Sequence, residues 1–307
     1  MHYRESGPHA PTGSDGDHDT VPRYIRSVSN TLQTIHDRYV RAGYRAPKPD
    51  GVRGGSAHTD VYVGDIGDDG LYGFCTSDDP KTAISDPGSY DVWAYCVLDD
   101  DYTRSQFPTN TPLENMRVTA AHEYFHAVQF GYDFAEDPWL LESTAAWVED
   151  ELYDSVDDNR QYLRNSPLRR PRMPLDTFGE EGFHYGTWIF WRYLTEKYRT
   201  RAGGLPTLVR DVWRRADGAA GRPDDHSTQA LQRCCAPGAR RSPSSSRCSP
   251  PPTGGRGPST TRAARRRTGP RPWRRRSRSG RGAPTRPPSA AGSTTSPPRR
   301  SATCRAG

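Results

Sequence analysis

The chain has 307 residues, of which 43 are Lys or Arg and 37 are Asp or Glu, giving a net charge of +6. Residues 1–232 hold all 37 acidic residues but only 24 of the basic ones, so their net charge is −13. No apolar stretch is long enough to cross a bilayer, which excludes a membrane-spanning helix. We therefore expect an acidic globular region followed by a basic segment.

An acidic turn lies near the start of the chain. Asp15, Asp17 and Asp19 alternate with Gly16 and His18. Alternate oxygen-bearing side chains can wrap around one hard cation, so the pattern allows a Ca²⁺ site. No glutamate follows at the spacing that closes an EF-hand loop, and a solvated acidic turn is the competing interpretation.

The N-terminal region has the pattern of mixed α/β structure. Residues 21–44 form a predicted helix, because their apolar side chains recur every three or four positions. Residues 60–65 and 90–98 alternate in the manner of strands. Cys75 and Cys96 each follow an aromatic run typical of a strand, so one prediction is a disulfide between adjacent strands and the other is two buried thiols.

A third predicted element is a helix over residues 112–130. Thr111 is a suitable N-cap, Pro112 suits the first helical position, and Glu114 completes a capping box. Gly131 is the predicted stop. This helix matters because it carries the most informative motif in the chain.

The motif is H-E-Y-F-H, at residues 122–126. Positions i and i+4 share one helix face, so His122 and His126 can bind the same Zn²⁺ ion. Glu123 is the predicted general base, which takes a proton from the attacking water. A hydrogen-bonded histidine pair without metal is the competing interpretation.

A third metal ligand is expected from the next helix. A catalytic zinc site uses three protein ligands and leaves one position for water. Residues 138–149 form a predicted helix, and Glu142 lies in its first turn, 16 residues after His126. Small residues in this helix permit close approach to the motif helix. Glu142 is therefore the predicted third ligand.

A donor for the developing oxyanion is expected near the metal, because it would stabilise the charge on the substrate carbonyl oxygen. His184 and Tyr185 precede a predicted helix over residues 188–198. Tyr185 is the predicted donor. His184 is the second candidate, and a purely structural role is its competing interpretation.

Residues 233–307 have a composition unlike the rest. They contain 19 arginines, no lysine, no acidic residue, and no Val, Ile, Leu, Met, Phe or Tyr. So few apolar side chains cannot offset chain entropy, and we expect a disordered tail. Clustered arginines are typical of nucleic-acid binding, but near-exclusive Arg, Pro, Ser, Gly, Ala and Thr favours an out-of-frame reading of a GC-rich gene. We therefore expect no nucleic-acid partner and a natural protein that continues differently after residue 232.

The helical blocks resemble the gluzincin clan of zinc metallopeptidases, in which H-E-x-x-H precedes a helix of the form W-L-x-E-G-x-A-x-W/Y. Within that clan the chain is most similar to a family of secreted bacterial metalloproteases of the myxobacterial and actinobacterial type, known largely from sequence. Three blocks carry the resemblance, at residues 121–130, 139–151 and 185–192. It covers roughly residues 2–232.

The resemblance implies that the two motif histidines and Glu142 hold zinc, and that Glu123 is the base of a peptide-bond hydrolase. It implies an α+β, zincin-like fold in which a small mixed sheet lies beside the motif helix and the glutamate helix. The edge strand of that sheet would hold the substrate backbone. Residues 1–110 would form the α/β part, and residues 111–232 the helical part, of one peptidase domain.

The chain departs from thermolysin-like relatives at Ala146, where those carry an acidic residue four positions after the ligand glutamate. The carboxylate that orients a zinc ligand must come from elsewhere, and Glu149 and Asp150 are the candidates. Glu149 lies seven residues after Glu142 and so on the same helix face, which also makes it the substitute third ligand. The competing interpretation is that residues 149–151 form a solvated acidic face.

The resemblance also implies an exported protein, although the chain opens without a leader. Residues 2–4 look like the first strand of such relatives, so we expect a misplaced start codon that removes a signal peptide. The predicted function is zinc-dependent hydrolysis of a protein or peptide substrate. The alternatives are a non-catalytic binding protein on the same fold and a truncated, inactive gene product.

Overall fold

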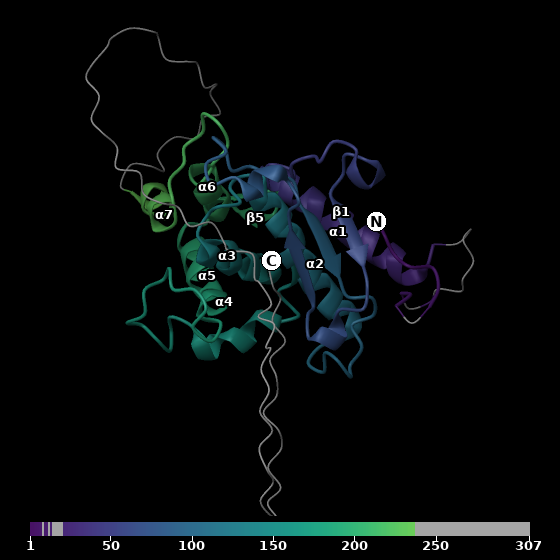
Figure 1. Cartoon of the computed structure of the whole chain (residues 1–307). Helices are drawn as coiled ribbons and strands as arrows, with labels where there is room; N and C mark the ends of the chain where they lie inside the picture. Colours follow the sequence, from purple (N-terminus) through teal and green to yellow (C-terminus); the bar gives the residue numbers. More distant parts are fainter. Residues whose placement is uncertain (8, 12, 14–20, 237–307) are drawn as a thin grey trace, which may run out of the picture.

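The computed structural model describes residues 1–7, 9–11, 13 and 21–236. Within these ranges lie seven α-helices, a three-stranded sheet and a two-stranded sheet (Figure 1). The architecture is mixed α+β, as the sequence predicted. No helix in the described ranges is both long and apolar enough to cross a membrane.

Two predictions fall outside the described residues. One is the acidic turn with Asp15, Asp17 and Asp19, and the other is the tail after residue 236. Close to that boundary, α7 spans Thr228–Cys235, so the last described helix crosses residue 232, where the composition of the sequence changes.

The first helix, α1, spans Arg23–Ala42, which confirms the helix predicted from the apolar repeat but is two residues shorter at each end. Its buried face packs against α2, and the Tyr39 hydroxyl donates a hydrogen bond of 2.8 Å to the carbonyl oxygen of Ala121. Ala121 directly precedes the H-E-x-x-H motif. The contact therefore fixes α1 against the part of α2 that carries the motif.

The main sheet has the strand order β1-β3-β2, with β1 at Asp60–Val63, β2 at Gly73–Thr76 and β3 at Tyr95–Leu98. β1 runs parallel to β3, and β2 runs antiparallel to it. The mixed sheet was expected, but the strands are shorter than the alternating patterns predicted. Residues 64–65 and 90–94 lie outside them.

The outer edge of β1 is partly covered, whereas β2 forms the opposite edge of the sheet. The backbone N–H of His2 donates to Val61 and its carbonyl accepts from Val63, each at 2.9 Å. The predicted strand at residues 2–4 is not formed. Only one isolated β-bridge, between His2 and Tyr62, stands in its place.

A disulfide joins Cys75 of β2 to Cys96 of β3, which confirms that prediction over two buried thiols. The antiparallel register places the two residues directly opposite each other, with their Cα atoms 4.1 Å apart. Both cysteines are buried, and the Cys75 sulfur lies 2.8 Å from the carbonyl oxygen of Glu123. The bridge thus lies between the sheet and the motif.

The motif helix, α2, spans Pro112–Phe130 and begins and ends as predicted. Thr111 and Glu114 form the capping box, which typically contributes about 1 kcal/mol, and Gly131 follows the last turn. Almost every side chain from residue 115 onward is buried. A helix buried on all sides needs packed neighbours all round, and α2 has the sheet and α1 on one side and α3 on the other (Figure 1).

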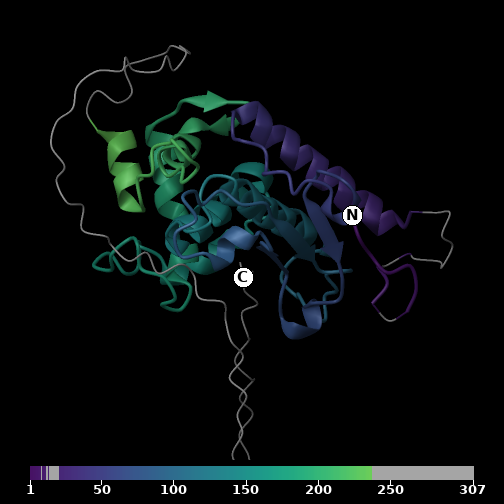
Figure 2. The ribbon, with the colours of Figure 1, turned by 45° about the horizontal axis from the view of Figure 1, so that its top comes forward.

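The glutamate helix, α3, spans Pro138–Tyr153, four residues longer than predicted, with Asp137 as its N-cap. The later helices pack against the side of α3 that faces away from α2. The hairpin β4–β5 lies next to the C-terminal end of α1 (Figure 2). These elements are α4 (Phe183–Gly186), α5 (Trp188–Lys197), β4 (Arg201–Ala202), β5 (Leu205–Pro206) and α6 (Thr207–Arg215). Short 3₁₀ helices are η1 (Arg53–Gly55), η2 (Gly67–Asp69), η3 (Pro80–Ala83) and η4 (Asp158–Asn165). One buried core contains residues from both parts of the predicted domain.

Candidate metal centre

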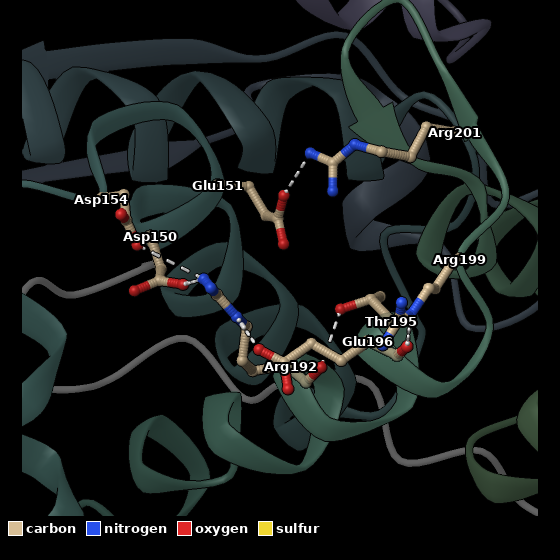
Figure 3. Close-up of a pocket in the computed structure, with 8 residues that line it drawn as sticks. All are labelled: Asp150, Glu151, Asp154, Arg192, Thr195, Glu196, Arg199 and Arg201. Carbon is tan, nitrogen blue, oxygen red and sulfur yellow. Dashed lines mark hydrogen bonds and ion pairs between the residues drawn. The ribbon is translucent and has the colours of Figure 1, made fainter.

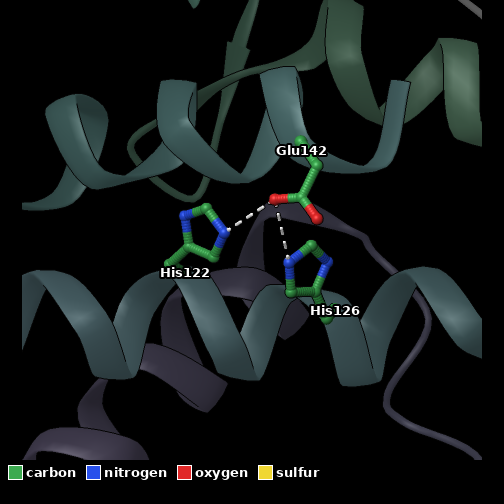
Figure 4. Close-up of side chains that lie close together, drawn as sticks. All are labelled: His122, His126 and Glu142. Carbon is green, nitrogen blue, oxygen red and sulfur yellow. Dashed lines mark hydrogen bonds and ion pairs between the residues drawn. The ribbon is translucent and has the colours of Figure 1, made fainter. Parts of the chain in front are cut away.

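Two helices bring the three predicted ligands together. His122 and His126 project from α2 toward Glu142 of α3 (Figure 4). The Glu142 Oε2 atom lies 3.3 Å from Nε2 of His122 and 3.6 Å from Nε2 of His126. All three residues are buried, with at most 5 % of their surface exposed. The interior of the protein therefore contains a compact set of two imidazoles and one carboxylate.

This spacing fits a single metal ion. Tetrahedral zinc binds its nitrogen and oxygen ligands at about 2.0–2.2 Å, which places neighbouring ligand atoms roughly 3.3–3.6 Å apart. Among the described residues, the buried Nε2 of His126 has no hydrogen-bond partner, as expected of an atom whose partner is a metal. His122, His126 and Glu142 can therefore hold a metal ion.

Glu149 orients the first of these histidines. Its Oε1 atom lies 2.6 Å from Nδ1 of His122. A ring that donates from Nδ1 leaves its Nε2 lone pair available to a metal, which is the usual role of such a carboxylate. Glu149 thus contacts a candidate ligand and is not a member of the His122, His126 and Glu142 group. Asp150, the other candidate, pairs instead with Arg192 of α5. Both acids are 6 % exposed, so the solvated-face interpretation is wrong.

Gln129 orients the second histidine, His126, as Glu149 orients His122. The sequence analysis did not predict this role. Its Oε1 atom accepts from Nδ1 of His126 at 2.6 Å. Its amide nitrogen donates to the Leu141 carbonyl and the Thr144 hydroxyl, both at 2.9 Å. The signal was a polar residue on a buried helix face three positions after a ligand. Its bonds to α3 depend on tertiary packing, which no local pattern contains.

The site holds an excess of acidic groups. Burial opposes the charged form of Glu142, but His126 and His122 outweigh burial and lower the pKa of this carboxyl. Burial also opposes the charged form of His122, yet Glu142 and Glu149 raise the pKa of the imidazole well above its ordinary value. Burial raises the pKa of Glu149 to about 7, although His122 acts in the opposite direction. With Glu123, three buried carboxyl groups surround two imidazoles, and a divalent cation would offset this excess.

Glu123 lies on α2 between the two histidines and is 1 % exposed. Strand β2 passes close to it. A Cβ atom at Gly73 would come within 2.9 Å of Glu123 Cγ and 2.8 Å of Thr119 Cγ2, so only glycine fits at this point of the strand. The close approach places the edge strand of the sheet directly beside the predicted base.

The two candidate oxyanion donors lie in α4, on the same side of α2 as α3. The Tyr185 ring centre is 6.1 Å from that of His122, and the ring stacks on Tyr162 of η4. His184 accepts a hydrogen bond of 3.2 Å from the Gly179 backbone N–H through Nδ1. Burial lowers the pKa of His184. Because Nδ1 accepts from the Gly179 N–H, Nε2 is the ring nitrogen that can donate a hydrogen bond. Both candidates thus lie near the metal ligands.

The charged cavity next to α3 is not part of this centre. It has a volume of about 570 Å³ and lies between α3, α5 and β4 (Figure 3). Its acidic and basic side chains pair with each other: Arg192 contacts Asp150 and Glu196, and Arg201 contacts Glu151. We interpret this network as a contact that fixes α5 against α3.

If His122 is a zinc ligand, Glu149→Gln should weaken zinc binding roughly 10-fold to 100-fold without unfolding the protein. The substitution keeps the shape of the side chain but removes the charge that makes His122 a stronger ligand. Zinc affinity is measured by competition with a chromophoric chelator. Glu151→Gln is the matched control, because this neighbouring acid contacts Arg201 rather than a histidine. Equal zinc affinity in Glu149→Gln and wild type would contradict the role assigned to Glu149.

Comparison with known proteins adds no relative. The chain matches no family model, no curated protein and no solved structure. The functional argument therefore rests on the residues of the metal centre and their geometry.

Proposed function

We propose that this protein is a zinc-dependent metallopeptidase. The observation that carries the proposal is the convergence of His122, His126 and Glu142 from two helices at the ligand spacing of tetrahedral zinc. Three protein ligands leave a fourth position for water or substrate, as in catalytic rather than structural zinc sites. Glu123 in the same buried site supplies the carboxylate that a hydrolase of this kind needs.

We further propose that the fold is zincin-like. The support is the arrangement of a small mixed sheet, a motif helix and a glutamate helix, in the order that the resemblance to gluzincins implies. The sheet packs on one side of α2 and α3 on the other. This layout puts the metal ligands between the two helices and the base next to the sheet.

The chemistry divides between the ion and the side chains. Bound zinc would lower the pKa of a water molecule and polarise the substrate carbonyl. Glu123 takes the proton from the attacking water and passes it to the leaving amine. Tyr185 donates a hydrogen bond to the oxygen on which negative charge develops, and His184 is the second candidate for this task. Glu149 and Gln129 hold the imidazoles in position throughout.

Strand β2 is the proposed holder of the substrate backbone. The Asp99 N–H donates to the Tyr72 carbonyl at 3.2 Å, which makes these residues a hydrogen-bonded pair in the ladder. Backbone groups alternate in direction along an antiparallel strand, so those of Gly73 and Cys75 face the outer edge of the sheet. A peptide that pairs with this edge would lie beside Glu123.

The disulfide supports the expectation that the protein works outside the cytosol. Disulfides such as Cys75–Cys96 persist in oxidising compartments and are rare where thiols are kept reduced. We therefore propose an exported enzyme that acts on proteins or peptides.

Zinc analysis and a protease assay on the full chain test the proposed function. We expect about one equivalent of zinc, together with cleavage of an unstructured protein such as casein. A chelator should abolish the cleavage and added zinc should restore it. Zinc binding without cleavage of any tested protein would favour a non-catalytic binding protein on this fold. Folded protein that binds no zinc would overturn the proposal.

A further inference from the structure

A second group of carboxylates lies where the parallel strands β1 and β3 end. Asp65 follows β1 by two residues, and Asp99 and Asp100 come directly after β3. One oxygen atom from each lies within 4.8 Å of the other two. We propose that Asp65, Asp99 and Asp100 bind a divalent cation and that Ca²⁺ is the preferred ion. This site is independent of the zinc centre and of the proposed function.

The spacing and the ligand type both fit calcium. Oxygen ligands lie about 2.3–2.6 Å from Ca²⁺, so two ligands on opposite sides of one ion are roughly 4.6–5.2 Å apart and neighbouring ligands are closer. All three side chains offer oxygen, which selects a hard cation over zinc or copper. Mg²⁺ demands a nearly ideal octahedron and retains its waters, whereas Ca²⁺ accepts irregular carboxylate clusters.

Asp100 is a buried carboxylate with few partners, which a bound cation would stabilise. It is 5 % exposed, and within the described residues its carboxylate accepts a hydrogen bond only from its own backbone N–H. The neighbouring carboxylates of Asp99 and Asp101 add like charge beside this buried group. A carboxylate with these surroundings is poorly stabilised as an anion by the protein alone. A bound cation would supply the missing partner.

Asp99 holds the other side of the site in a fixed position. Its Oδ1 atom accepts from the backbone N–H of Gly67 at 2.7 Å, and its Oδ2 atom accepts from that of Tyr102 at 2.7 Å. The backbone of Asp99 also accepts a hydrogen bond of 2.6 Å from the hydroxyl of Tyr24, in the first turn of α1. A cation at this point would therefore connect the loop after β1, the loop after β3 and the start of α1.

Thermal unfolding of the full chain in a Ca²⁺ titration tests the site, with zinc concentration held constant. After removal of bound calcium, we expect Ca²⁺ to raise the Tm by roughly 5 °C at saturation, with a Kd between about 10⁻⁵ and 10⁻³ M. Mg²⁺ at the same concentration should give a smaller shift. The absence of any Ca²⁺-dependent shift up to 10-fold above that range would overturn the proposal.

Asp100→Asn provides the sharper measurement, because its effect should change sign. In calcium-free buffer the variant should have a higher Tm than wild type, since it removes a buried, poorly paired charge. In saturating Ca²⁺ it should have a lower Tm, because the ion no longer binds. Asp65→Asn, at a less buried position, should also reduce the affinity at least 10-fold.

Two control variants separate this site from other acidic residues. Asp86→Asn removes an exposed charge between η3 and β3 and should leave the Ca²⁺ response unchanged. The triple variant Asp15→Asn, Asp17→Asn, Asp19→Asn should also keep the response. If the triple variant loses the response while Asp100→Asn keeps it, the calcium site is in the acidic segment at residues 15–19 and the proposal is wrong.

Discussion

Glu142→Gln should release zinc from the protein and abolish hydrolysis. The substitution keeps the size of the side chain but replaces a buried carboxylate, 3.3 and 3.6 Å from the two imidazole Nε2 atoms, with a neutral amide. Loss of a direct ligand should weaken zinc binding by more than the roughly 10-fold to 100-fold that loss of an orienting group costs. Zinc content is measured by mass spectrometry after dialysis, and cleavage is measured on the same samples.

The control for this prediction comes from the same helix. Asp154→Asn changes an exposed acid at the C-cap of α3 and should retain both zinc and activity. Circular dichroism should show that Glu142→Gln remains folded, because the side chain is nearly isosteric. If folded Glu142→Gln retains wild-type zinc, then Glu142 is not a ligand and the proposed metal centre is incorrect.

Glu123→Gln should give the opposite combination, with zinc retained and hydrolysis lost. Glu123 is adjacent to the ligand His122 in α2 but is not a member of the ligand group itself. A glutamine cannot accept the proton of the attacking water, and loss of a general base typically lowers the rate by about 10²-fold to 10⁴-fold. The ligands are unchanged, so the zinc affinity should stay within a few-fold of wild type. The turnover rate is measured with zinc present in excess.

The two variants together separate the ligand from the base. A purely steric role would let the nearly isosteric Glu123→Gln keep its activity, whereas a base requires a carboxylate. We therefore expect partial activity in Glu123→Asp and much less in Glu123→Gln. Full activity in Glu123→Gln would mean that another group takes the proton.

The local features of the metal centre were predictable because they depend on helix periodicity. His122 and His126 share a helix face by their spacing, and Thr111 and Glu114 mark the start of that helix. Glu142 was predicted from the ligand count of a catalytic zinc site and from the helix that carries it. Each of these inferences needed only a stretch of about twenty residues.

The prediction for the C-terminal half of α3 was less complete. Spacing placed Glu149 on the same helix face as Glu142 but left its role open between ligand, orienting carboxylate and solvated acid. Packing of α3 against α2 decided this, because it brings the Glu149 carboxylate to the far nitrogen of His122. Asp150 is one position further and therefore faces Arg192 of α5 instead.

The sequence by itself determined that the two imidazoles share a helix face and where the helix that carries them and the candidate base begins and ends. Only the tertiary structure decided that β2 is the strand beside Glu123, that Gln129 links His126 to α3, and that Asp65 meets Asp99 and Asp100. The physical reason is the range of the forces involved. Backbone hydrogen bonding fixes side-chain direction within one helix or strand, whereas contacts between elements depend on how buried surfaces from distant segments pack together.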